Sequence, residues 1–343
     1  MDRVLEIGGY TAGYAGRLFA RDGCDVVRVD GHEVWPGWVC DEADDLYLHA
    51  GKRRVRDIDA ATLTALADRA DVVICEAGSA DALEALGFAS WQTPVKIAVT
   101  PFGRTGPKRN WAATPATLLA MGGYTYLVGD ADAAPLSLPG YYVEYQSGAL
   151  AYAAANALRL SGRVESADIS MLEVVMSLSQ FTTVRWHCAG EIRGRHGSDF
   201  WFVVPSEMFR CQDGAVYINI VPAFWDALTV FIDRPELLVD PRFETNDLRM
   251  ENREALHAYV AEAVAPMSRA ELQRKADECR IPLGLVLSFD EVLADPHLSA
   301  RDSWETIKAS AGAELRAPRV PFRMGDSPGA QPIPAVRLEE ASW

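Results

Sequence analysis

Short apolar segments alternate with helical patterns through the first hundred residues. Four of these segments have the continuous apolar character of buried strands: 3–9, 24–31, 71–78 and 95–103. The segments between them have the periodicity of helices: 10–23, 61–70 and 81–88. A repeated strand–helix–strand order predicts a parallel sheet with helices on both faces. We therefore expect an α/β fold for this part of the chain.

The alternation ends near Thr114, where the chain becomes helical and rich in alanine. Beyond it, FRCQDGAVYINIV (209–221) predicts a hairpin around Asp213-Gly214. Helical patterns follow, so residues 200–310 are predicted to form a separate, smaller α+β module. A length of 343 residues agrees with more than one domain. The tail at 317–334 contains five of the 19 prolines and predicts an extended segment lying on another element.

Composition excludes several classes of function. The formal net charge of −15 would repel a phosphate backbone, so we expect no nucleic-acid partner. The N-terminus lacks the pattern of a signal peptide, and no run of about 18 apolar residues predicts a membrane span, so we expect a cytoplasmic protein without membrane contact. The six cysteines and six histidines show no metal-ligand spacing, so no metal site is predicted.

Two loops could hold an anionic ligand. GGYTAGYAG (8–16) follows a predicted strand and opens a helix, where backbone N–H groups can bind a phosphate. Helix–sheet packing alone would equally explain these glycines. PFGRTGPKRN (101–110) follows another strand, at the sheet edge where open α/β folds hold ligands. That stretch could also be an ordinary turn.

A basic cluster stands out in an acidic chain. LHAGKRRVR (48–56) contains Lys52, Arg53, Arg54 and Arg56, and arginine is suited to bidentate phosphate contacts. The cluster could bind the phosphates of a nucleotide-like ligand. The alternative, which composition favours, is a solvated turn that balances the acids at 41–45.

Glu144 begins an alanine-rich helix in YYVEYQSGALAYAAANAL (141–158). The helix dipole favours an ionised carboxylate in the first turn, which would hold Glu144 ready as a nucleophile or base. Stabilising the start of the helix is the simpler role for such a residue. GxSxG is absent, which disfavours serine-type hydrolysis.

Taken together, these segments resemble family III CoA transferases, a group that also contains 2-methylacyl-CoA racemases. The matching stretches run in family order over nearly the whole chain: RVLEIGGYTAGYAGRLFARDGCDVVRVD, GKRRV, ADVVICEAG with DALEALGF, VTPFGRTGP, the helix after Glu144, ADISMLEVV, MFRCQDGAVYINI and DEVLADPHLSARDSW. The resemblance implies a large Rossmann-like domain (1–199), a small α+β domain (200–310), and a C-terminal segment (311–343) that returns to the large domain. It also implies an interlocked homodimer.

The resemblance also implies a chemistry. In the transferases an Asp four residues before a helix glycine attacks the acyl-CoA thioester, and Glu144 stands four residues before Gly148. The carboxylate then carries CoA as a covalent thioester before an acceptor acid completes the exchange. CoA serves as a co-substrate, with no tightly bound cofactor; the partners are a CoA thioester and a small carboxylic acid. The expected CoA-contacting residues are Thr11, Ala12, Gly13, Leu48, His49, Ala50, Gly51, Lys52, Arg53, Ala77, Gly78, Arg104, Arg109 and Asn110.

The chain departs from the family pattern at several positions. Ala77 replaces the family's Asn, Glu84 and Gly31 fall where the family has basic residues, and Glu144 replaces an Asp. The racemase His would fall near Thr114, so racemisation is not expected. These departures leave open a repurposed enzyme that uses Glu144 as an acid/base on a thioester or free acid, and a non-catalytic small-molecule-binding homologue. An NAD-linked oxidoreductase is disfavoured because the glycines do not form GxGxxG.

Overall fold

A computed structural model describes residues 2–32, 42–308, 314–323, 337–338 and 343. The chain divides into two compact units. The large unit contains the residues up to Tyr126, Ser137–Arg193 and Pro296–Trp343, and the small unit contains Leu127–Leu136 and Gly194–Asp295. No sequence pattern indicated that 127–136 belongs with the small unit. The domain boundaries expected at 199/200 and 310/311 remain predictions.

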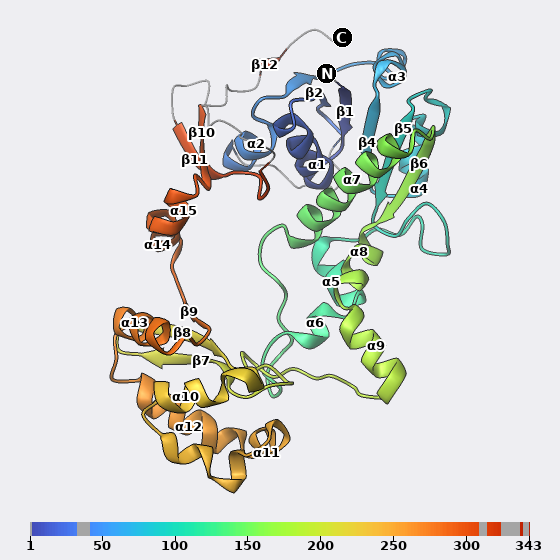
Figure 1. The fold of residues 1–343 in the computed structure, drawn as a ribbon. Helices are drawn as coiled ribbons and strands as arrows, with labels where there is room; N and C mark the ends of the chain where they lie inside the picture. Colours follow the sequence, from blue (N-terminus) through green and yellow to red (C-terminus); the bar gives the residue numbers. More distant parts are fainter. Residues whose placement is uncertain (1, 33–41, 309–313, 324–336, 339–342) are drawn as a thin grey trace. The chain divides into compact units, whose positions relative to one another are not determined.

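A parallel sheet with the strand order β12-β3-β2-β1-β4-β5-β6 forms the centre of the large unit (Figure 1). Every neighbouring pair in it is parallel, which confirms the predicted sheet. The strands are β1 (Arg3–Ile7), β2 (Asp25–Val29), β3 (Arg53–Val55), β4 (Val72–Glu76), β5 (Val95–Thr100), β6 (Glu165–Ser170) and the two-residue edge strand β12 (Arg337–Leu338).

Helices cover both faces of this sheet (Figure 1). The large-unit helices are α1 (Tyr10–Arg21), α2 (Glu42–His49), α3 (Ala60–Arg69), α4 (Ala80–Ala85), η1 (Phe88–Ser90), α5 (Pro115–Met121), α7 (Tyr142–Ser161), α8 (Met171–Leu178), α9 (Gln180–Ala189) and α15 (Pro296–Ala300). α6 (Tyr124–Leu127) lies at the boundary of the two units. None of the helices in the described ranges is long and apolar enough to cross a membrane.

Successive strand residues point to opposite faces, as the period of two requires. Val4 and Ile74 pack in a cluster with α1, α5, α7 and α8. Leu5 and Val73, their neighbours in sequence, pack in a second cluster with α3 and α4. Because both faces are buried, the central strands read as continuous apolar runs. This explains why the sequence located β1, β2, β4 and β5.

β3 was not predicted as a strand. Arg53 and Arg54 fall within it, and the basic stretch lacks the apolar pattern of the central strands. β3 lies near the edge of the sheet, where polar side chains can remain partly exposed: Arg53 pairs with Asp25 at 2.6 Å and Arg54 with Asp30 at 2.8 Å.

The small unit combines a short antiparallel sheet with helices. Its sheet has the order β7-β8-β9, and Cys211 pairs with Gly214 across the β7–β8 hairpin. This confirms the predicted hairpin, but the turn is formed by Gln212 and Asp213, one residue earlier than the predicted Asp213-Gly214. The elements are β7 (Ser206–Cys211), β8 (Gly214–Asn219), η2 (Pro222–Phe224), α10 (Trp225–Phe231), η3 (Pro235–Leu238), η4 (Pro241–Phe243), α11 (Asn246–Glu251), α12 (Arg253–Val264), α13 (Arg269–Cys279), β9 (Leu283–Leu285) and α14 (Phe289–Ala294).

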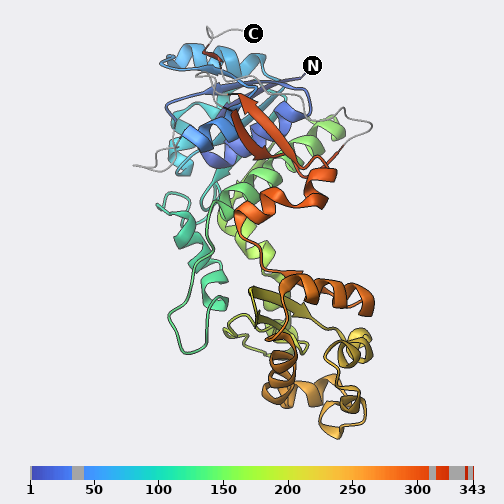
Figure 2. The same cartoon turned by 90° about the vertical axis from the view of Figure 1, so that its left-hand side faces the viewer.

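The chain after the small unit contributes a hairpin to the large unit. β10 (Trp304–Lys308) and β11 (Glu314–Pro318) pair antiparallel and lie over α1 and α2 (Figure 2). Glu305 of β10 is buried and forms ion pairs with Arg17 and Arg21 of α1. Most of the predicted extended proline-rich tail, from 324 to 334, lies outside the described residues.

Candidate functional site

Glu144 lies in the first turn of α7, on the face that packs against α1. Gly148, one turn further along, permits the close approach of the two helices. A Cβ atom at this position would stand 2.7 Å from the carbonyl oxygen of Thr11. Side chains four residues apart share a helix face, so Glu144 is directed toward the N-terminal part of α1.

The Glu144 carboxyl group is buried, and no other described residue donates a hydrogen bond to it. The residue is 1% exposed, and neither carboxyl oxygen has a partner among the described residues. Burial raises the pKa of Glu144 to about 7; its own backbone N–H opposes this shift, and the nearby Glu76 adds to it. The sequence suggested an ionised carboxylate favoured by the helix dipole. In the structure burial outweighs the dipole, so this carboxyl group titrates near neutral pH.

Glu76, the last residue of β4, occupies the start of α1. One of its carboxyl oxygens, Oε2, accepts hydrogen bonds from the backbone N–H groups of Gly9 and Ala12, each at 3.0 Å. The sequence suggested that these amides could bind a phosphate. In the structure they bind a carboxylate of the same chain, which fills the positive end of the helix. Burial raises the pKa of Glu76, while the same amides oppose the shift.

At this edge of the sheet, further buried polar atoms find no hydrogen-bond partner in the part of the chain that the structure describes. They are Thr11 Oγ1 of α1, Thr100 Oγ1 at the end of β5, Ser147 Oγ of α7 and Glu76 Oε1 at the end of β4. A buried polar group without a hydrogen bond costs about 1–3 kcal/mol. Because stability does not explain such a collection, the carboxyl edge of the sheet is the candidate site, in agreement with the rule for open α/β folds.

The structure brings the two predicted loops at 8–16 and 48–54 together. A Cβ atom on Gly13 would lie 3.0 Å from the His49 ring, so these two residues are in contact. Thr11, Ala12 and Gly13 fall in the first turns of α1, and Leu48, His49 and Ala50 are buried at the end of α2. Gly51 is exposed in the turn that follows.

Lys52 is a buried member of an internal charge network. Its ammonium group contacts Glu6 Oε2 at 2.5 Å, the Gly13 carbonyl at 2.8 Å and His49 Nδ1 at 3.1 Å. Burial lowers the pKa of Lys52 to about 7, partly opposed by Glu6. Together with the pairs made by Arg53 and Arg54, these contacts use much of the predicted basic cluster to balance acids of the same chain.

The third predicted loop, at 101–110, contacts neighbouring segments of the large unit. The Arg104 backbone N–H donates to Asp168, and Arg109 approaches Asp81 at 3.6 Å while remaining 47% exposed. Asn110 accepts a hydrogen bond from the Asp81 backbone. Ala77 and Gly78 follow β4, and the Ala77 amide donates to Val99 of β5. This loop is therefore fixed beside the segment 77–81.

Sequence reasoning missed Glu76, Thr100 and Ser147 as site residues. Glu76 and Thr100 are single polar residues at the ends of apolar stretches, whereas Ser147 follows Gln146. The available signal was position: Glu76 and Thr100 end neighbouring parallel strands and therefore meet at one edge of the sheet. Ser147 precedes Gly148 on α7 and carries no separate pattern.

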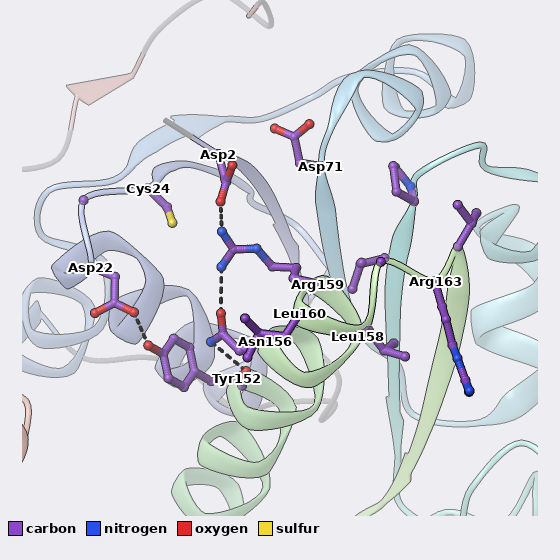
Figure 3. A pocket seen from close by; sticks show the side chains of 15 residues that line it. Asp2, Asp22, Cys24, Asp71, Tyr152, Asn156, Leu158, Arg159, Leu160 and Arg163 are labelled. Carbon is purple, nitrogen blue, oxygen red and sulfur yellow. Dashed lines mark hydrogen bonds and ion pairs between the residues drawn. The ribbon is translucent and has the colours of Figure 1, made fainter.

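A pocket of about 990 Å³ opens at the opposite edge of the sheet (Figure 3). It is lined by residues at the amino ends of the strands and at the C-terminal end of α7: Asp2, Asp22, Gly23, Cys24, Asp71, Pro94, Val95, Tyr152, Asn156, Leu158, Arg159, Leu160, Gly162, Arg163 and Val164. Arg159 pairs with Asp2, and Tyr152 donates to Asp22. Glu144 and Arg159 are separated by about 22 Å along α7, so this pocket is distinct from the candidate site.

Comparison with protein families gives one match over almost the whole chain. The family model described as CoA-transferase family III covers residues 2–338. Curated relatives include succinyl-CoA–D-citramalate CoA-transferase of Chloroflexus aurantiacus, which is 28% identical over 95% of this chain and 88% of its own length. Succinyl-CoA:mesaconate CoA-transferase of Haloarcula marismortui is 26% identical, over 96% of this chain and 91% of its own.

Solved structures share the fold. A CaiB/BaiF family protein from Brucella suis superimposes with a TM-score of 0.81 at 22% identity, covering 98% of this chain and 95% of its own. Rv3272 of Mycobacterium tuberculosis gives a TM-score of 0.82 at 22% identity, covering 98% and 96%. At this level of identity the likeness is one of fold.

Proposed function

This chain belongs to CoA-transferase family III, and we propose that it transfers CoA through the carboxylate of Glu144. The activity is CoA transfer between an acyl-CoA thioester and a carboxylic acid, as in the family's curated members. The observation that carries the assignment to Glu144 is its buried, unpartnered carboxyl group, one turn before Gly148 at the carboxyl edge of the sheet.

The proposed reaction moves CoA from the donor to the acceptor acid in successive steps. The Glu144 carboxylate attacks the thioester carbonyl of the donor, forms a mixed anhydride and releases CoA thiolate. The thiolate attacks the Glu144 carbonyl of that anhydride, which releases the donor acid and leaves a glutamyl-CoA thioester. The acceptor carboxylate attacks this thioester to form a second anhydride and free the thiolate. Attack of the thiolate on the acceptor's acyl carbonyl yields acceptor-CoA and restores Glu144.

The electrostatics support this role. A nucleophilic carboxylate must be ionised, and a pKa of about 7 leaves a large ionised fraction at neutral pH. Because no other described residue donates a hydrogen bond to its oxygens, the ionised group is poorly stabilised and therefore reactive. In the structure both oxygens are covered. The proposal therefore requires the residues around α1 and α7 to open when an acyl-CoA enters.

We propose that the CoA moiety lies along the loops 8–16, 48–54 and 101–110. The contact between Gly13 and His49 supports a shared surface for the first two loops. Lys52 is already engaged by Glu6, so its proposed contribution is to hold the loop in place. Arg109 is the better placed cation for a phosphate because nearly half of its side chain is exposed. We further propose a homodimer, as the resemblance implies.

The relatives suggest the substrates to test. Succinyl-CoA or succinate appears in the names of the Chloroflexus and Haloarcula enzymes and of succinate–glutarate CoA-transferase from Agrobacterium fabrum, 24% identical over 98% of this chain and 92% of its own. We propose succinyl-CoA as donor and small dicarboxylic acids as acceptors.

Glu144 variants test the proposal through the exchange of CoA between succinyl-CoA and labelled succinate. We expect E144Q to abolish exchange. We expect E144D to reduce it by about a hundredfold, because misplacing the oxygens by about an ångström costs on that order. Glu165, whose side chain is 51% exposed, provides the control E165Q, which should match the wild type. Full exchange activity in E144Q would rule out Glu144 as the nucleophile.

The pKa of Glu144 also agrees with one alternative function. A value of about 7 suits a general acid or base acting on a thioester or free acid without CoA transfer. An enzyme of that kind would convert its substrate while failing to exchange label between succinate and succinyl-CoA. The same assay therefore separates the two functions.

A further inference from the structure

Three potential metal ligands meet in the small unit. Asp199 precedes β7, Glu207 lies in β7 and His257 lies in α12. One ligand atom from each of these side chains lies within 4.8 Å of the other two. Their positions in the sequence are far apart and follow no ligand spacing, which is why sequence analysis predicted no metal site.

Two of the three side chains have a buried polar atom that no described residue satisfies. Asp199 Oδ1 and His257 Nε2 make no hydrogen bond with any described residue. The Asp199 side chain is only 10% exposed. Leaving two such atoms unsatisfied within one cluster of side chains would be costly without a ligand. This observation is independent of the clustering and points to a bound group.

The surroundings hold the three side chains in place. The Asp199 Oδ2 atom pairs with Arg253 at 2.5 Å, while no residue in the described ranges bonds to Oδ1. Arg253 and His257 are one turn apart on α12 and so share a face. The His257 ring packs edge-on against Phe209, two residues after Glu207 on the same face of β7, at 5.7 Å between ring centres. One Glu207 oxygen, Oε1, accepts hydrogen bonds from Ser198 Oγ and from the Met208 backbone N–H at 2.8 Å.

The charge and chemistry of the cluster fit a divalent cation. Two carboxylates against the single guanidinium of Arg253 leave one net negative charge around a neutral imidazole. Mixed nitrogen and oxygen ligands are typical of zinc and its neighbours, whereas magnesium prefers oxygen alone. Three protein ligands leave one position of a tetrahedral zinc open. Small side-chain rotations would bring the ligand atoms to the ~2.0–2.2 Å bonds of zinc.

We propose that Asp199, Glu207 and His257 form a divalent transition-metal site in the small unit, separate from the CoA-transfer site. Binding there joins the segment before β7 to α12. The full-length protein, dialysed against Zn²⁺ and then analysed for metal content, should retain one equivalent. Mg²⁺ should not be retained under the same conditions.

Variants of two of the proposed ligands test whether zinc binds at this site. H257A and E207Q should lower zinc affinity at least tenfold, and circular dichroism should match the wild type. H187A removes an exposed histidine beside the exposed Cys188 and serves as the matched control; zinc retention should be unchanged. Anomalous diffraction at the zinc edge should place the ion between the three side chains. No retained zinc, equal retention by H257A and E207Q, or an ion at another place would overturn the proposal.

Discussion

Glu144 and Glu76 influence one another at the candidate site. Both carboxyl groups are buried, and Glu76 contributes to the raised pKa of Glu144. Two ionised carboxylates close together in a poorly solvated site repel one another, so the charge of Glu76 favours the protonated form of Glu144. The amides of Gly9 and Ala12 compensate Glu76 but do not reach Glu144.

This electrostatic relation predicts the pH dependence of CoA exchange. The nucleophile must be ionised, so the rate should rise with pH through a midpoint of about 7. The negative charge of Glu76 raises that midpoint, so E76Q should move it to lower pH, while Gln can still accept the two amide hydrogen bonds. The measurement is the pH–rate profile of succinyl-CoA exchange for the wild type, E76Q and the control E165Q. A midpoint unchanged in E76Q would contradict the relation.

Only part of this description of the candidate site could be predicted from the sequence. The resemblance to the transferases, through the spacing of Glu144 and Gly148, predicted Glu144 as the nucleophile, and the start of a helix suggested an ionised carboxylate. The pKa of Glu144 depends on its burial and on the nearby Glu76. The packing of distant strands against α1 and α7 brings Glu76 close to Glu144. A sequence pattern contains no measure of either effect.

At the scale of elements, the packing of α7 on α1 positions the site. The two helices approach closely only because Gly148 has no side chain. G148A should push α7 away from the Thr11 carbonyl, since a Cβ would lie 2.7 Å from it. We expect a loss of about 1–3 kcal/mol in the free energy of unfolding, typical of overpacking, together with a fall in CoA exchange.

Urea denaturation of G148A measures the effect on stability. Q146A, an exposed position on the same helix, is the control and should differ from the wild type by less than about 0.5 kcal/mol. If G148A were as stable as Q146A, α1 and α7 would not be held at the distance that the structure gives.

The central strands were predictable because burial on both faces leaves a continuous apolar run. Strand β3, next to the edge strand β12, was not predictable, since Arg53 and Arg54 carry the charge pattern of a turn. The same charge pattern left two interpretations of the basic stretch open, a phosphate site and a turn that balances nearby acids. Partners such as Asp25 and Asp30 come from a neighbouring strand, and only the sheet order brings them there.

At the scale of the whole molecule, the large unit is assembled from separated parts of the chain. Glu305, after the small unit in sequence, is buried against Arg17 and Arg21 of α1. Removing one partner of a buried ion pair typically costs about 3–5 kcal/mol because a charge remains without compensation. E305A should therefore destabilise the large unit by that amount and increase hydrogen exchange in β10 and β11.

A second acid in the same hairpin provides the control. Glu314 pairs with Lys308 at 3.8 Å, and both side chains are more than half exposed. E314A should cost less than about 1 kcal/mol, as exposed pairs do. If E305A and E314A had equal effects on unfolding and exchange, the buried pair would not fix the C-terminal hairpin.

The family, the parallel sheet and the hairpin of the small unit could all be predicted from ordered stretches of sequence. The membership of 127–136 in the small unit and the meeting of Asp199, Glu207 and His257 could not. Both depend on long-range contacts between segments that carry no local signal.

The central claim is that Glu144 carries CoA covalently. The most direct test incubates the protein with succinyl-CoA in the absence of an added acceptor, treats it with hydroxylamine and identifies the modified residue by peptide mass spectrometry. The account predicts a hydroxamate at Glu144 in the wild type and none in E144Q. A hydroxamate at another residue, or none in an enzyme that still exchanges CoA, would contradict it.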